Sequence, residues 1–155
     1  MIISASRRTD IPAFYADWFY NRLKEGYCTV FNPFNRNQVR YVSLEPQDVD
    51  VIVFWTKHSK AFRPRLDLLD EKQIPYYFQY TLVDYNKEIE TKVPGFDLLK
   101  EEFLRLSERV GADRIIWRYD PIIISQEYSA ERHSDQFASI ANQLKGSTNR
   151  VVISI

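Results

Sequence analysis

The chain has 155 residues, 21 of them lysine or arginine and 21 aspartate or glutamate, with a formal net charge of zero. The length is that of one domain, and a composition of 45% hydrophobic and 15% aromatic residues excludes a disordered chain. Zero net charge argues against a general attraction to nucleic acid or to an anionic membrane. Any attraction to an anion must therefore be local.

Cys28 is the single cysteine of the chain, which excludes an internal disulfide and any all-cysteine zinc or iron–sulfur site built from this chain alone. No apolar run approaches the roughly 20 residues of a membrane span. Arg7 and Arg8 stand where a signal peptide would need its apolar segment. We therefore expect a cytoplasmic protein that does not contact a membrane.

The first part of the chain predicts a strand, a helix and a β-hairpin. Residues 1–6 are too few and too apolar for an amphipathic helix, so they predict a buried strand. Asp10 is suited to cap the helix that follows and Gly26 to end it. One apolar stripe of this helix is predicted to face the core: Phe14, Tyr15, Trp18, Phe19 and Leu23. Residues 27–31 and 39–44 then predict the two strands of a hairpin.

Strands and helices alternate through the rest of the chain. The apolar runs that predict strands are residues 50–55, 76–83, 114–119 and 150–155. Helical periodicity separates them at residues 62–69, 97–110 and 129–145. Residues 84–95 are polar and charged, and they predict a surface loop over the ligand edge of the sheet.

This alternation has the spacing of right-handed βαβ units. It predicts an α/β fold in which residues 1–155 form a single domain, a partial (β/α)6 TIM-like barrel with a β-hairpin inserted after strand 2. A complete eight-fold barrel takes about 250 residues, so we expect either a partial barrel or a truncated chain. The last strand would be an exposed apolar edge, which predicts self-association.

A short polar cluster follows each apolar run. The clusters are residues 4–12, 32–35, 56–59, 81–86 and 118–120. Parallel strands place their carboxyl ends at one edge of a sheet, where α/β proteins bind their ligands. We therefore expect the five clusters to meet in one site.

Four cations stand at predicted strand ends: Arg7, Arg8, Lys57 and Arg118. Arginine offers a planar fork for bidentate contacts and lysine a point charge, so these side chains are predicted to bind a small anionic ligand, a carboxylate or a phosphate. Alternatively they pair with carboxylates in a structural network, the candidates being Asp10, Asp84 and Asp120. The two interpretations are compatible if the carboxylates orient the cations toward a ligand.

Asp10, Asn32 and Gln79 add hydrogen-bonding groups to the predicted ligand-binding set. Histidine is the side chain best suited to proton transfer near neutral pH, so His58 is predicted, with Asp120, to act as an acid or base. Simpler roles stay open: Asp10 as a helix cap, Asp120 as a turn residue and His58 as a surface loop residue. Carboxylates also bind hard metal cations. Because Asp10 and Asp120 have these simpler roles available, we predict no metal site.

Several of these runs together resemble an uncharacterised family of bacterial and archaeal domains. The motifs that carry the resemblance are SASRRTDIPAFY at 4–15, NPF at 32–34, VFWTK at 53–57, FQYTL at 78–82 and IWRYDPI at 116–122. Longer members of that family end in a cysteine cluster similar to those of radical S-adenosylmethionine enzymes. The resemblance therefore implies a β/α partial barrel of that kind.

This chain departs from the family pattern at two points. It ends at Ile155, before the cysteine segment, and His58-Ser59 stands where the family has Asn-Pro. An iron–sulfur cluster and S-adenosylmethionine are thus expected only together with such a C-terminal segment. Two functions stay open: the barrel portion of a radical S-adenosylmethionine-like enzyme, or a non-catalytic module that binds a phosphate, nucleotide or carboxylate.

Overall fold

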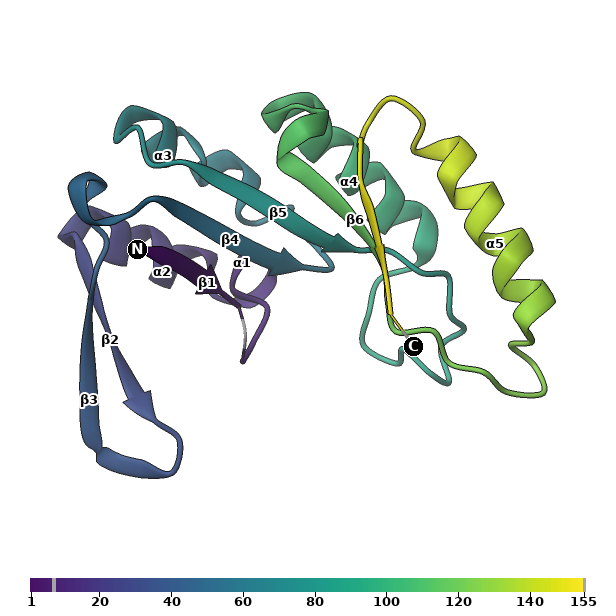
Figure 1. The fold of residues 1–155 in the computed structure, drawn as a ribbon, viewed down its shortest axis with the longest axis horizontal. Coiled ribbons are helices and arrows are strands. Elements are labelled where there is room, and N and C mark those ends of the chain that lie inside the picture. Colours follow the sequence, from purple (N-terminus) through teal and green to yellow (C-terminus); the bar gives the residue numbers. More distant parts are fainter. Residues whose placement is uncertain (7, 155) are drawn as a thin grey trace.

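A parallel sheet of five strands forms the centre of the fold (Figure 1). The computed structural model describes residues 1–6 and 8–154. The strands are β1 (Ile2–Ala5), β4 (Val51–Thr56), β5 (Tyr76–Thr81), β6 (Ile115–Tyr119) and β7 (Val151–Ile153), and they lie in the order β1-β4-β5-β6-β7. Among the described residues β1 and β7 are the two edges of this sheet, so a mixed α/β fold is confirmed with an open sheet.

The helices cover one face of the sheet (Figure 1). They are α1 (Ile11–Phe14), α2 (Ala16–Glu25), α3 (Asp67–Glu71), α4 (Phe96–Val110) and α5 (Ala130–Gln143), with 3-10 turns at 46–48, 63–65 and 112–114. Ring contacts join α2 to β4, α4 to β5 and α5 to β6, from Phe19 to Phe54, Phe103 to Tyr80 and Phe137 to Trp117. α2, α4 and α5 therefore bury their apolar residues against the same side of the strands.

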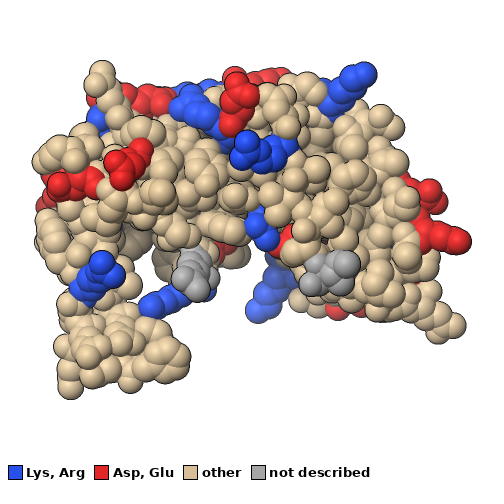
Figure 2. All heavy atoms as spheres, in the orientation of Figure 1, with Lys and Arg blue, Asp and Glu red and all other residues tan. Residues whose placement is uncertain are grey.

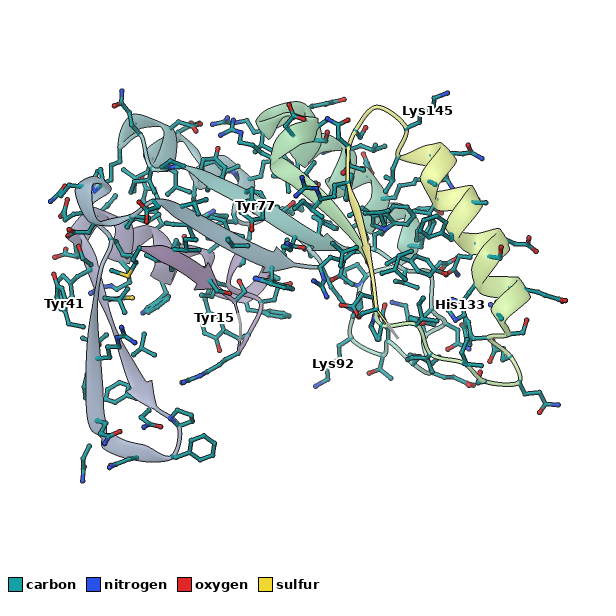
Figure 3. The ribbon with its side chains drawn as sticks, viewed as in Figure 1. Tyr15, Tyr41, Tyr77, Lys92, His133 and Lys145 are labelled. Atoms are coloured by element: carbon teal, nitrogen blue, oxygen red, sulfur yellow. The ribbon has the colours of Figure 1, made fainter. Side chains whose placement is uncertain are left out.

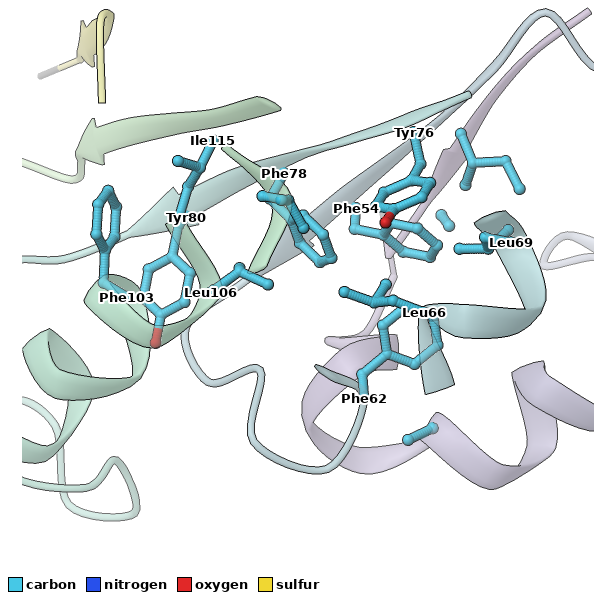
Figure 4. Close-up of a cluster of buried hydrophobic side chains, with 14 of the residues drawn as sticks. Phe54, Phe62, Leu66, Leu69, Tyr76, Phe78, Tyr80, Phe103, Leu106 and Ile115 are labelled. Atoms are coloured by element: carbon cyan, nitrogen blue, oxygen red, sulfur yellow. The ribbon is translucent and has the colours of Figure 1, made fainter. Parts of the chain in front are cut away.

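The core lies between this face and the helices, and its centre is aromatic (Figure 4). Phe54 is fully buried, and its ring lies 4.8 Å from that of Phe62 and 5.2 Å from that of Phe78, measured between centroids. Alternate residues of a strand point to opposite faces, so Phe54, Phe78 and Tyr80 share the helix side. We call this side the covered face.

The other side of the same strands carries Val53, Trp55, Tyr77, Gln79, Ile116 and Arg118. We call it the open face. The register confirms the grouping, because Val53 lies opposite Tyr77, Trp55 opposite Gln79, and Gln79 opposite Ile116. Most of its side chains are only partly buried.

The predicted second core strand is not part of the sheet. β2 (Tyr27–Asn32) pairs only with β3 (Asn35–Ser43), as an antiparallel hairpin that projects from the rest of the molecule. Of the six residues of β2 only Cys28 is buried, whereas a central parallel strand is buried on both faces. The sheet therefore has five strands, and the prediction of six core strands was wrong.

The first predicted helix is two helices that meet at Tyr15, because α1 ends there and α2 begins at Ala16. The break changes which residues face the core. Phe19 and Leu23 are buried, but Phe14 is 75% exposed, and Tyr15 and Trp18 are also exposed. The predicted apolar stripe was thus correct only in its second half. Gly26 ends α2 as predicted, with a left-handed φ of 78°.

Candidate functional site

Three side chains of the open face meet near the carboxyl ends of β4, β5 and β6. Trp55 of β4 is the register partner of Gln79 of β5. Arg118 of β6 is the register partner of Thr81, two residues after Gln79 on β5. The Arg118 guanidinium carbon stands 4.4 Å from the centroid of the Trp55 ring. This cation–π contact holds the positive charge over the open face. With Lys57, which follows β4 directly, these residues form what we call the strand-end site.

Arg118 is oriented by a carboxylate. Its Nη2 donates a hydrogen bond to Asp120, and the side chains are only 15% and 21% exposed. Asp120 also accepts a hydrogen bond from the Ser154 hydroxyl, just after β7. Burial acts to raise the pKa of Asp120, but the hydrogen bonds from Arg118 and Ser154 and the charges of Arg118 and Lys57 outweigh it, so the pKa lies below its usual value. Asp120 is therefore a charged partner of Arg118.

Lys57 pairs with a residue that the sequence did not single out. Its ammonium group donates to Glu90, whose side chain is 14% exposed, within the long polar loop after β5. The pairing shows that this loop reaches the strand ends, as its length and polarity predicted. The particular partner depends on the path of the loop through space, which no local pattern encodes.

Asp10 holds the first helix against the sheet. Its Oδ1 accepts the backbone N–H of Ala13 at 3.0 Å, which makes it the N-cap of α1, and its Oδ2 accepts the backbone N–H of Lys57 at 2.7 Å. Burial raises the pKa of Asp10, and the hydrogen bonds from Lys57, Thr56 and Ala13 only reduce that rise. The predicted cap is confirmed. Because both oxygens are engaged, the carboxylate joins α1 to the end of β4.

Two buried polar atoms without a hydrogen-bond partner belong to register partners on the open face, Trp55 and Gln79. Among the described residues there are six such side-chain atoms, and three are Trp55 Nε1, Gln79 Oε1 and His58 Nε2. His58 follows Lys57, and its backbone N–H donates to the Thr56 hydroxyl at 3.0 Å. Native structures leave few buried polar groups unpaired. Trp55 Nε1 and Gln79 Oε1 are therefore a donor and an acceptor on the open face that the described residues leave without a partner.

Two predicted ligand-binding residues lie with the hairpin. Asn32 hydrogen-bonds to Gln38 and to the backbone N–H of Phe34, both within the turn region of β2 and β3. Its cluster does not join the others because β2 is outside the parallel sheet. Arg8 donates from Nη1 to the carbonyl oxygen of Phe31 at 3.0 Å. Arg7 lies outside the described residues.

The structure thus places Lys57, Gln79 and Arg118 at one edge of the sheet, pairs Arg118 with Asp120, and ties Asp10 to the end of β4. His58 follows Lys57 at the same strand end, and its side chain hydrogen-bonds to none of the other described site residues. The cation platform Trp55 was missed as a site residue, although its place directly before the Thr56-Lys57 cluster was a usable signal. Ser154 was missed because only the pairing of β6 with β7 brings it to Asp120.

An open parallel sheet with helices on one face and a polar site at its carboxyl edge defines a mixed α/β protein. The chain belongs to the family described as "Domain of unknown function (DUF1848)", whose model matches residues 2–155. The expectation of an uncharacterised family is thereby confirmed. No curated protein and no solved structure gave a significant match to the chain.

In residues 1–6 and 8–154 no helix combines the length and apolar character that crossing a bilayer requires. The same residues contain no cluster of three or more histidine, cysteine, aspartate or glutamate side chains arranged to hold a metal ion.

Proposed function

We propose that the strand-end site binds a small anion, a carboxylate or a phosphate, through Arg118 and Lys57. One observation carries the proposal: the Arg118 guanidinium is held on the Trp55 ring, beside two buried polar atoms that have no partner. Ligands of α/β proteins bind at this edge of the sheet.

Arg118 keeps donors available for such a ligand. Its hydrogen bond to Asp120 uses Nη2, which leaves the N–H groups of Nε and Nη1 to face an anion. A second cation, Lys57, follows β4 directly at the same edge, and its ammonium group donates one hydrogen bond to Glu90 and keeps two further N–H groups. A carboxylate or phosphate could therefore accept a fork of hydrogen bonds from Arg118 and a further one from Lys57.

The unpaired atoms narrow the chemistry of the ligand. Trp55 Nε1 is a donor and requires an acceptor, whereas Gln79 Oε1 is an acceptor and requires a donor. An anion that also carries a hydroxyl or amino group satisfies both. Hydroxy acids, amino acids, nucleotides and protonated forms of phosphate meet this description, whereas an anion without an O–H or N–H group, such as sulfate, meets only half of it. His58 stays the candidate acid–base group beside this ligand.

Titration calorimetry with three probes tests the proposal: inorganic phosphate, malate and adenosine monophosphate. Arg118→Ala should weaken every probe that binds by about tenfold or more, because a charge-assisted hydrogen bond contributes about 1.5–3 kcal/mol. The matched control is Arg105→Ala, since Arg105 pairs with Glu101 on the exposed surface of α4. Unchanged affinity in Arg118→Ala, or no binding of any probe to the wild type, would refute it. Binding of malate alone would assign a carboxylate site.

A second candidate is the barrel portion of a radical S-adenosylmethionine-like enzyme. It is supported by the family resemblance and by the open face, which would line the interior of a barrel. The described residues do not fit an iron–sulfur cluster: Cys28 is buried in β2, and burial raises the pKa of its thiol. Cluster ligands would have to come from a cysteine segment, as in the longer relatives. Anaerobic reconstitution of such a relative tests this, and failure to take up iron would count against it.

A further inference from the structure

A groove lies between β1, α2 and the hairpin, away from the Arg118 and Gln79 part of the strand-end site. It encloses about 820 Å³, within the range of ligand-binding cavities, and the space-filling view shows the molecule hollowed beside the hairpin (Figure 2). Residues 1–6 of the first strand form one wall, α2 contributes Trp18 and Phe19, and β2 and β3 form the other wall. We call it the edge groove.

The walls of the edge groove are apolar and exposed. Ile2 is 71% exposed, and Tyr15, Trp18 and Val30, which also line the groove, are exposed as well. Figure 3 labels Tyr15 beside the end of β1, and Tyr41 on the side of the hairpin away from β1. A contiguous apolar patch of this kind marks an interaction site in soluble proteins. The hairpin thus presents side chains to a partner that the described residues do not supply.

The positive charge of the edge groove favours a partner with a negative charge. Arg8 and Arg40 line it, and none of its described lining residues is acidic. The hydrogen bond of Arg8 goes to the neutral carbonyl oxygen of Phe31, so its charge is not balanced by that contact. An apolar groove with two arginines and no carboxylate complements an apolar partner that carries an anionic group.

The unpaired backbone edge of β1 favours a partner with an extended conformation. β1 pairs with β4 and with no other strand of the described residues, so its second edge faces the groove. On the opposite wall β2 pairs only with β3, and the Phe31 carbonyl turns to Arg8 instead. An unpaired strand edge is a template for one more strand, and extended peptides bind proteins in this way.

We propose that the edge groove binds an extended peptide segment that adds a strand to the free edge of β1. Alternate apolar side chains of the segment pack against Tyr15 and Trp18, and its carboxylate lies between Arg8 and Arg40. This inference is independent of the anion proposed for the strand-end site. A fatty acid would satisfy the walls and the arginines but would leave the strand edge unused.

Amide chemical shifts of the isotope-labelled protein test the proposal, because they detect weak binding. The probe is an acetylated peptide of alternating valine and threonine that ends in glutamate. Its matched control carries N-methyl groups on alternate residues and cannot complete a ladder. We expect the first peptide to shift the amides of β1 and β2 and the methylated one to leave them unchanged. Equal binding of the two peptides, or no shift in β1, would overturn strand addition.

Variants and competing occupants complete the test. The double variant Arg8→Ala with Arg40→Ala should weaken the peptide by about fivefold, and Arg105→Ala should not. Thermal unfolding of the two variants checks that the fold is kept. Stronger shifts of the same amides with decanoate than with the peptide would assign a fatty-acid site. Dimerisation in sedimentation that buries β1 would assign a second copy of the chain, and either result would overturn the proposal.

Discussion

Two tryptophans on opposite faces of one sheet show how differently those faces are built. Trp117, on the covered face, is 2% exposed and donates from Nε1 to the carbonyl oxygen of Leu82 at 2.9 Å. Trp55, on the open face, is only partly buried, and its Nε1 is buried without a partner. The same side chain is thus satisfied by the fold on one face and left unsatisfied on the other.

The contrast extends along the strands. On the covered face the Tyr80 hydroxyl donates to the carbonyl oxygen of Leu99 at 3.1 Å, and the Tyr119 hydroxyl donates to Gln136 and meets His133. On the open face Gln79 Oε1 is unpaired and Arg118 stacks on Trp55. Unpaired buried polar atoms also occur on the helix side, at Ser59 and Glu102, so the faces differ mainly in that Trp55, Gln79 and Arg118 lie on a surface that no described helix covers. The covered face therefore stabilises the fold, and the open face is available for function.

The largest expected effect is at the centre of the covered face. Phe54→Ala removes a ring packed against Phe19, Phe62 and Phe78, and should lower the free energy of unfolding by about 4 kcal/mol. Val53→Ala, one residue along on the open face, should cost less than half as much. Urea denaturation measures both values. Equal losses would contradict the assignment of the core to one face.

Exchanging the two tryptophans for phenylalanine gives the sharpest contrast. Trp117→Phe leaves the Leu82 carbonyl oxygen without its donor and opens a small cavity, so it should cost about 3 kcal/mol. Trp55→Phe removes a donor that already lacks a partner, and should change stability by less than about 0.5 kcal/mol. Thermal unfolding of both variants is the measurement. A large loss in Trp55→Phe would mean that its indole N–H serves the fold.

Asp10 lies at the end of β4, and its contribution to the free energy of unfolding should fall between those expected for Trp117 and Trp55. Asp10→Ala deprives the backbone N–H groups of Ala13 and Lys57 of their acceptor, and should cost about 2 kcal/mol. Denaturation in urea measures the loss. A cost near zero would show that neither hydrogen bond contributes to stability in solution.

The smallest expected effect is a pH dependence from Asp120. Because its pKa is lowered in the folded state, the ionised form contributes stability above the unfolded value of about 3.9, and this is lost as the pH falls through the folded pKa. Asp120→Asn should therefore cost stability at pH 7 and little at pH 2. The pKa of Asp10 is raised, so its contribution has the opposite sign and falls as the pH rises. An Asp120→Asn cost that is independent of pH would contradict the ion pair with Arg118.

The sequence predicted most elements because local signals determine them. The capping residue Asp10 marked the start of α1, and Gly26 marked the end of α2. Continuous apolar runs marked β4, β5 and β6. The hairpin was found, but not its exclusion from the sheet, because pairing partners are set by tertiary contacts. The break at Tyr15 was missed for the same reason: tertiary packing decides which aromatic residues of α1 and α2 are buried.

The candidate site was predicted in part. We predicted that Lys57, Gln79 and Arg118 lie at one edge of the sheet because parallel strands run in the same direction, and the structure places them there. Asp120 was predicted to act as an acid or base and, alternatively, to pair with the cations; its ion pair with Arg118 agrees with the alternative, and the acid–base role stays a prediction. Glu90 and Ser154 reach the site through the path of a loop and the pairing of the last strand, and neither follows from local pattern.

The indole N–H signal of Trp55 tests most directly whether the open face is completed by a ligand. In nitrogen-15 spectra the Trp55, Trp117 and Trp18 signals are assigned by replacing each tryptophan with phenylalanine, and the protein is then titrated with malate, adenosine monophosphate or phosphate. We predict that the Trp55 indole proton moves downfield as it gains an acceptor, while the signal of Trp117 stays in place. A Trp55 signal that does not move when the anion is saturating would contradict the account.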